Sequence, residues 1–211
     1  TRLEKAIFSN ARMLPRQAAI TALSRIRSPE GTSLIARCVD DLAAGSLPPA
    51  LHLDVIECAE SCSAELVKER LKAYLSDRPG GDVVDARSEL LEGGDPAAGR
   101  RVYEKPEAMC VKCHAIGGRG GLVGPDLSGV GTVRTRRQLL ESLLLPNKEI
   151  ASEYRTVILL TEEGTHVGRV LSENEMEIVI LDAEGRPQRV RKSHIQDRRQ
   201  GLSAMPENVT E

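Results

Sequence analysis

Two cysteines and a histidine stand together near the middle of the chain, in the string Cys110-Val111-Lys112-Cys113-His114. Thiols at this spacing can reach the two vinyl groups on one edge of a haem and form thioethers with them. The histidine that follows can then supply an axial nitrogen to the iron. The string therefore predicts one covalently attached haem c, with Cys110 and Cys113 as the attachment points and His114 as an iron ligand.

Three other interpretations of the cysteine pair are open. A thioredoxin-like redox pair would stand between a strand and a helix, whereas here a loop precedes the pair and a glycine-rich stretch follows it. Structural zinc needs four ligands, and the sequence contains no second Cys-x-x-Cys and no His-x-x-x-His. A chance match that binds no cofactor is the third interpretation, because short motifs produce false positives.

The string Gly124-Pro125-Asp126-Leu127 follows the cysteine motif and favours the haem interpretation. The backbone carbonyl of Pro125 is expected to accept the Nδ1 hydrogen of His114 and so to fix its tautomer and orientation. Leu127 is expected to press on the haem ring. A Gly-Pro pair is also compatible with an ordinary turn.

A second iron ligand is expected from a methionine or a histidine elsewhere in the chain. The candidates are Met13, His52, Met109, His166, Met176, His194 and Met205. Met205 is favoured because it stands in an irregular stretch before Pro206, where a thioether has adaptable reach and a stiff neighbour. His194 and His166 come next, although both stand in or at the end of expected strands.

Helical periodicity dominates the first part of the chain. Residues 1–78 show about five short amphipathic helices in hairpin-like succession, as in stacked pairs of the HEAT type. The string Pro79-Gly80-Gly81 opens an expected linker over residues 79–94. Cys38, Cys58 and Cys62 fit as small apolar core residues of the helical domain.

A second domain is expected over residues 95–211, beginning with a helix that Asp95 caps and Pro96 starts. An alternating pattern over about residues 155–196 predicts an inserted antiparallel meander or small barrel. Its expected strands are 156–161, 165–171, 175–182 and 188–192.

Composition narrows the function classes. The 211 residues carry a formal net charge of −2 and include three Tyr, one Phe and no Trp. Nucleic-acid binding is not expected, because aromatic side chains for base stacking are lacking. No stretch of the sequence is long and apolar enough to predict a transmembrane segment.

These residues resemble class I c-type cytochromes. The resemblance adds Gly99 and Tyr103 as the contact residues of an opening helix and Met205-Pro206 as the distal loop. A closer resemblance is to a haem-binding domain of planctomycetes and verrucomicrobia, which helical repeats often precede. The strings that carry it are Leu90–Arg100, Gly120–Ser128, Leu145–Ile150 and Ser203–Pro206.

The resemblance implies a mainly α fold: a HEAT-like helical domain followed by a class I cytochrome c fold with a small β insertion. The closing helix of that fold finds no match in the sequence up to Glu211. It also implies a periplasmic electron carrier, not an enzyme, with one His/Met-ligated haem that receives electrons from a dehydrogenase. An apolar haem pocket is expected from Leu122, Leu127, Val130, Leu139 and Leu143.

Two alternative functions are kept. One is a haem protein with an open or weak sixth site, either peroxidase-like or gas-sensing, which would require that Met205 not bind iron. The other is a docking module of a larger dehydrogenase complex, to which a basic run could contribute. That run comprises Arg186, Arg189, Arg191, Lys192, Arg198 and Arg199, and it is equally compatible with a solvated strand face.

Overall fold

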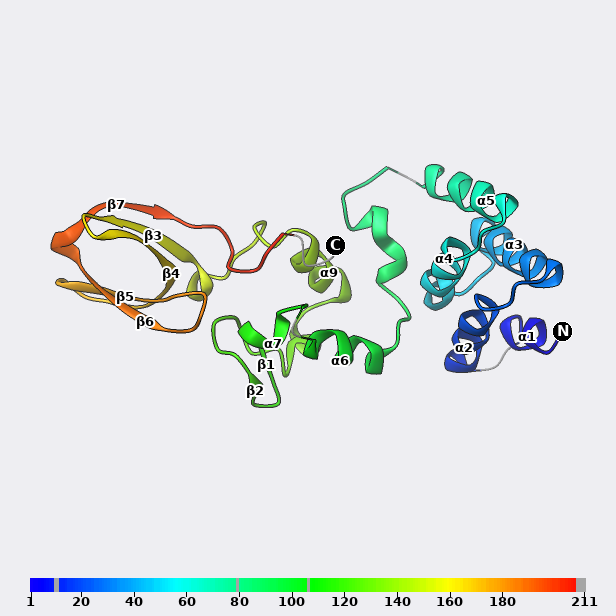
Figure 1. Cartoon of the computed structure of the whole chain (residues 1–211), viewed down its shortest axis with the longest axis horizontal. Coiled ribbons are helices and arrows are strands. Elements are labelled where there is room, and N and C mark those ends of the chain that lie inside the picture. The colour runs from blue at the N-terminus through cyan, green and yellow to red at the C-terminus, as the bar shows by residue number, and fades with distance from the viewer. Residues whose placement is uncertain (10–11, 79, 106, 208–211) are drawn as a thin grey trace. The chain divides into compact units, whose positions relative to one another are not determined.

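The computed structural model of the chain describes residues 1–9, 12–78, 80–105 and 107–207. The chain divides into two compact units, Thr1–Asp95 and Pro96–Glu211 (Figure 1). The first unit is helical, and the second combines short helices with a five-stranded sheet.

In its described residues, the first unit contains five α-helices and 3₁₀ turns at Pro49–Leu51 and Asp85–Leu90. They are α1 (Arg2–Ile7), α2 (Met13–Leu23), α3 (Pro29–Ala43), α4 (His52–Glu60) and α5 (Glu65–Ser76). Helix α3 begins where Ser28 Oγ accepts the Gly31 amide at 3.2 Å and Pro29 occupies the first helical position. Apolar side chains at helical spacing meet between these helices, and Ile20, Leu51, Val55 and Val67 have no exposed surface.

The three cysteines of the helical unit are core residues, as the sequence predicts. Cys38, Cys58 and Cys62 are all free and buried. Burial raises the pKa of both the Cys38 and the Cys58 thiol to about 12. These thiols therefore stay protonated and unreactive at neutral pH.

Most of the expected linker, residues 79–94, packs onto the first unit. Val84 is completely buried, and an Arg78–Glu89 ion pair of 2.9 Å spans this segment. Gly93, with φ +77°, lies so close to the Ala50 carbonyl that a Cβ could not be accommodated. The boundary between the units therefore lies at residues 95 and 96.

The second unit begins with short elements around the cysteine motif. They are α6 (Pro96–Glu104), α7 (Cys110–Cys113), β1 (Ala115–Ile116), β2 (Arg119–Gly120), α8 (Val130–Val133) and α9 (Arg136–Leu144). A capping box between Thr135 and Gln138 starts α9. Helices α6, α7 and α8 contain no buried residue. The apolar burial that stabilises this unit therefore comes mainly from its sheet.

The core of the second unit is an antiparallel sheet in the order β6-β5-β4-β3-β7. Its strands are β3 (Thr156–Thr161), β4 (Gly164–Glu173), β5 (Glu177–Leu181), β6 (Pro187–Arg191) and β7 (Ile195–Gln200). Alternate residues face one side and form a core of Val157, Leu159, Ile178, Ile180 and Val190. The short 3₁₀ turn Lys192–His194 leads the chain from β6 to β7, which pairs with β3.

The prediction of a mainly α chain with a small β insertion in a class I cytochrome c fold is wrong. The sheet has five strands and its own buried core, whereas the helices around the cysteine motif bury little. The chain is therefore a mixed α and β protein. The fifth strand, β7, was not predicted, because its sequence from Gln196 to Gln200 is polar throughout.

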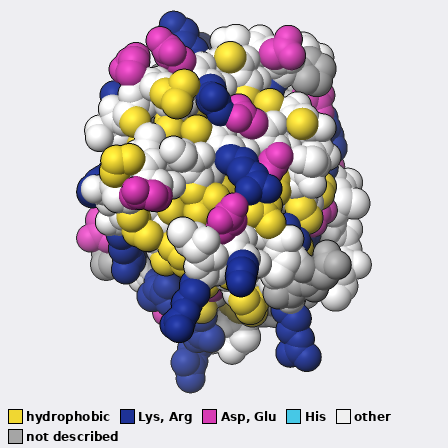
Figure 2. Space-filling view, turned by 90° about the vertical axis from the view of Figure 1, so that its right-hand side faces the viewer, with side chains coloured by type: hydrophobic (Ala, Val, Ile, Leu, Met, Phe, Trp, Pro, Cys, Tyr) yellow, Lys and Arg dark blue, Asp and Glu magenta, His cyan; other side chains and the backbone are white. Residues whose placement is uncertain are grey.

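Within the described residues, no helix combines the length and the apolar character that crossing a membrane requires. On the face shown in Figure 2, which lies on the side of helices α1–α5, acidic and basic side chains are interspersed. Apolar side chains are exposed between them.

Truncation of Leu159 tests the sheet core. Leu159 has no exposed surface, whereas Leu171 of the neighbouring strand is 45% exposed. We expect Leu159→Ala to lower the free energy of unfolding by about 2–5 kcal/mol, because it leaves a cavity. The matched variant Leu171→Ala should lower it by less than about 1 kcal/mol. Equal losses in urea unfolding would contradict this core.

Asp182 gives the sheet a pH dependence. Its carboxylate accepts the backbone N–H of Arg186 at 2.8 Å and of Glu184 at 3.0 Å, and the Gln188 amide at 2.9 Å. The bond from the Arg186 backbone first, and then those from the Gln188 and Arg186 side chains, lower the pKa of Asp182. Because the pKa of Asp182 is lower in the folded state than in the unfolded state, ionisation of this carboxyl stabilises the fold. The stabilisation is fully present above the unfolded-state pKa of about 3.9, and it is lost as the pH falls through the folded-state pKa.

We therefore expect Asp182→Asn to be less stable than the wild type at pH 7 and to approach it in acid. The measurement is urea unfolding at about pH 7 and about pH 3, since these values bracket the ordinary carboxyl pKa. A stability difference that does not shrink in acid would contradict this role of the Asp182 carboxylate.

Candidate functional site

The cysteine motif forms a single helical turn, α7, that ends at His114. The His114 amide donates to the Cys110 carbonyl at 2.9 Å, and Met109 enters the turn in the left-handed region with φ 58°. Residues three apart on a helix lie on one face, so the two motif thiols are neighbours. Both Cys110 and Cys113 are free and half-buried. Partial burial raises the pKa of Cys113.

The predicted hydrogen bond between His114 and Pro125 is present. Nδ1 of His114 lies 2.9 Å from the Pro125 carbonyl oxygen. A carbonyl can only accept, so we assign the hydrogen to Nδ1. The other ring nitrogen, Nε2, then carries a lone pair and can bind a metal.

The glycine-rich stretch is ordered by the backbone of the motif itself. Amides of this stretch donate to carbonyls of the motif segment at three places. The bonds are Gly121 to Val111 at 2.9 Å, Gly124 to Cys113 at 2.7 Å and Leu127 to Ala115 at 2.8 Å. The loop therefore lies along the cysteine turn and holds its shape.

Gly124 must be glycine for steric reasons. A Cβ at this position would lie 2.6 Å from Cε1 and 2.8 Å from Nδ1 of the His114 ring. A Cβ at Gly121 would lie closer still to the Lys112 carbonyl oxygen. The glycines thus allow the loop to approach the imidazole closely.

Three further hydrogen bonds, which the spacing of the motif does not reveal, hold the site. Tyr103 of α6 donates its hydroxyl to the His114 carbonyl at 2.6 Å. Asp126 accepts the Ser128 amide at 2.7 Å, and Ser128 Oγ accepts the Gly117 amide at 2.8 Å. The Ser128 bonds lower the pKa of Asp126, so its carboxylate stays charged and braces the loop.

The five expected pocket residues do not form a buried cavity. Leu122 is 76% exposed and Leu143 is 41% exposed, while Leu127, Val130 and Leu139 are half-buried. Other large apolar side chains of the same part of the unit are also exposed: Val102, Met109, Ile116, Val133 and Leu145. Apolar side chains are therefore exposed at several positions around the cysteine turn.

Met205 lies in the loop that follows β7, and hydrogen bonds attach this loop to the end of α9. The Ser203 amide donates to Asn147 Oδ1 at 2.7 Å, and Asn147 donates to Glu207 at 2.6 Å. The Met205 amide donates to Ser203 Oγ at 3.1 Å. None of these bonds joins Met205 to the cysteine turn.

The two histidines next in line as ligands have partners within the sheet. Nδ1 of His166 lies 3.0 Å from Gln188 Oε1. Nδ1 of His194 lies 3.7 Å from a carboxylate oxygen of Glu163. Neither contact joins a histidine to the cysteine turn. Met205 stays the favoured candidate on the sequence argument alone.

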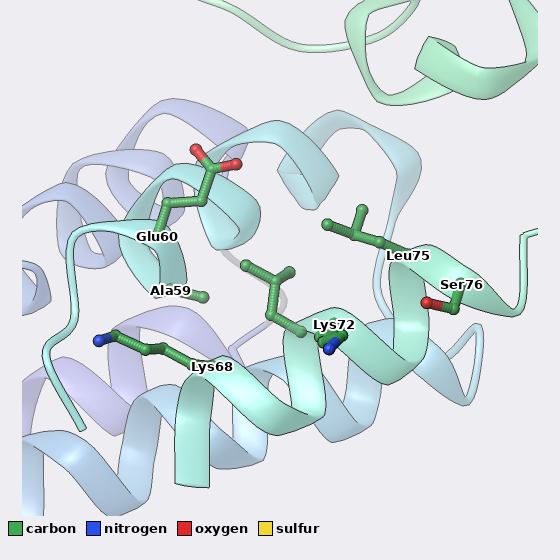
Figure 3. A pocket seen from close by; sticks show the side chains of 7 residues that line it. Ala59, Glu60, Lys68, Lys72, Leu75 and Ser76 are labelled. Atoms are coloured by element: carbon green, nitrogen blue, oxygen red, sulfur yellow. The ribbon is translucent and has the colours of Figure 1, made fainter. Parts of the chain in front are cut away.

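A groove of about 430 Å³ lies in the helical unit, between α4 and α5 (Figure 3). Its lining comprises Ala59, Glu60, Lys68, Leu71, Lys72, Leu75 and Ser76. None of the predicted site residues lines it. The cysteine turn, and not this groove, is the candidate functional site.

Comparisons with known proteins add no family to this geometry. No protein-family model matches the chain, and no curated protein matches it significantly. Among the described residues, no three His, Cys, Asp or Glu side chains gather in a way that could hold a metal ion.

Gly124→Ala tests the fit of the loop to the imidazole. The added methyl should displace the His114 ring and break its bond to Pro125, so the fraction of ring protonated at Nδ1 should fall. We would measure this by ¹⁵N NMR of the histidine side chains. Gly131→Ala is the matched control, because a Cβ there meets no atom within 4 Å. A ring tautomer unchanged in Gly124→Ala would contradict the described contact.

Proposed function

We propose that the chain is an electron-carrying c-type cytochrome module. A single haem would be attached through Cys110 and Cys113, with His114 as the proximal iron ligand. The observation that carries the proposal is the held imidazole: its Nδ1 is bound to the Pro125 carbonyl at 2.9 Å, on a turn with two free thiols. This arrangement leaves Nε2 as the ligating atom.

The state of the cysteines supports the same assignment. The motif thiols are half-buried and lie on one helical turn, so a large reagent can reach them. The other three, Cys38, Cys58 and Cys62, are buried in the helical core. Only one pair in the chain thus has the accessibility that thioether formation requires.

The exposed apolar side chains around the motif fit a large apolar cofactor. Leu122, Leu143 and Ile116 each show more than a third of their surface to solvent. Covering such side chains with a porphyrin face is favourable by about 25 cal/mol for each Å² removed from water. A chain this poor in aromatic residues gains an apolar ring system in this way.

The haem would supply a reversible one-electron couple, and the protein would set its ligation. His114 is held in one orientation by Pro125, and Tyr103 fixes its backbone. Met205 is the proposed distal ligand, which would make the module a carrier and not an enzyme. We further propose a periplasmic location and a dehydrogenase as electron donor, because the resembled haem proteins occur in that setting.

The direct test is visible spectroscopy of the full chain expressed with a haem c maturation system. We expect a pyridine haemochrome that stays on the polypeptide after denaturation. It should be absent in Cys110→Ala/Cys113→Ala and retained in the control Cys58→Ala. A correctly folded chain that carries no haem under these conditions would sink the proposal.

Replacement of Met205 tests the distal ligand. We expect a low-spin spectrum with a sulfur-to-iron charge-transfer band that disappears in Met205→Ala, because no other thioether replaces it. Met176→Ala is the matched control, since Met176 lies in the turn between β4 and β5 and is 77% exposed. A high-spin spectrum in the wild type, indifferent to Met205→Ala, would instead favour an open sixth site of the peroxidase-like or gas-sensing kind.

A further inference from the structure

The sheet of the second unit touches the loop that orients His114. Arg169 of β4 donates through Nη2 to the backbone carbonyl of Leu122 at 3.1 Å. The next residue, Val123, is buried and lies beside Gly185 of the β5–β6 turn, where a Cβ would be 3.7 Å from Val123 Cγ2. The loop is therefore packed between the cysteine turn on one side and the sheet on the other.

Arg169 is itself fixed in place. Its Nη1 donates to the Glu153 carbonyl at 3.4 Å, and its guanidinium lies over the Tyr154 ring at 5.0 Å. Its Nε is buried and has no hydrogen-bond partner within the described part of the chain. Burying part of a guanidinium costs free energy unless its N–H groups are hydrogen-bonded. The two hydrogen bonds of Arg169 join β4 to the backbone at Glu153 and at Leu122.

The contact reaches the imidazole through two residues of backbone. Leu122 accepts from Arg169, Gly124 donates to Cys113 at 2.7 Å, and Pro125 accepts from His114 at 2.9 Å. Loss of the Leu122 bond would remove the hydrogen bond between this segment and Arg169 and leave the segment bonded to the cysteine turn. Since Gly124 fits against the ring with no spare room, a small shift of the loop changes the position of His114.

We propose that Arg169 is a positioning residue for His114, through which the sheet supports the iron ligand. The positioning of the ring follows from the contacts above, whereas the binding of iron by His114 rests on the proposed function. The sheet then contributes to the haem site by holding the loop that orients His114.

The test uses the full chain produced without haem maturation, so that it does not depend on haem uptake. In Arg169→Gln we expect the Gly121 and Gly124 amides to exchange at least about tenfold faster, because a charge-assisted hydrogen bond is lost. The fraction of His114 protonated at Nδ1 should fall as well. In Arg169→Lys the cation is kept and the planar fork is lost, so partial rescue is expected.

Arg189→Gln is the matched control. It makes the same charge change on the same sheet, but Arg189 is a surface residue whose partner at 2.9 Å is Glu177 of the neighbouring strand. Exchange of the Leu159 and Ile180 amides reports whether the sheet is intact in each variant. If the Leu159 and Ile180 amides lose their protection from exchange in Arg169→Gln, the sheet is disturbed in that variant. The test then uses Arg169→Lys, with loop amide exchange and the His114 tautomer as its two measurements. Loop exchange and tautomer equal to those of Arg189→Gln would overturn the proposal.

The same variants with haem attached separate the two proposals. If haem is attached, Arg169→Gln should shift the reduction potential and Arg189→Gln should not, because only the former changes the ligand's setting. If the wild-type chain takes up no haem, the proposed function fails. The exchange and tautomer data then still decide whether Arg169 positions His114.

Discussion

The hydrogen bond from His114 Nδ1 to the Pro125 carbonyl is the contact on which the rest of the site depends. It removes one of two tautomers and leaves a single nitrogen able to bind a metal. The neighbouring contacts of the loop and of Tyr103 hold the two bonded groups in place. Gly124 gives the ring room, and the amides of Gly121 and Gly124 keep the loop against the cysteine turn. Tyr103 holds the backbone of the histidine through a hydrogen bond to its carbonyl.

The mixed architecture gives each part of the chain a different source of stability. The helical unit and the sheet each bury a contiguous apolar core, whereas the segment around the cysteine turn relies on hydrogen bonds and exposes apolar side chains. A segment of this kind is expected to gain order from whatever binds it. Single hydrogen bonds that attach this segment to better packed structure, such as the bond from Arg169 to Leu122, therefore contribute strongly to its position.

Local patterns in the sequence predicted local features of the structure well. The bond between His114 and Pro125, the buried cysteines and the four strands from β3 to β6 follow from motif spacing and period. The mainly α fold class was wrong because periodicity does not reveal how much core each element buries. Contacts distant in sequence, such as Arg169 with Leu122, leave no periodic signal. Strand β7 was missed because a polar edge strand resembles a loop.

The most direct test of the account is a count of free thiols in the denatured chain after expression with haem maturation. The chain has five cysteines. With one haem attached at the motif, the intact mass should rise by one haem, and only three thiols should be alkylated, at Cys38, Cys58 and Cys62. Alkylation of Cys110 and Cys113 as well, in a chain with no added mass, would contradict it.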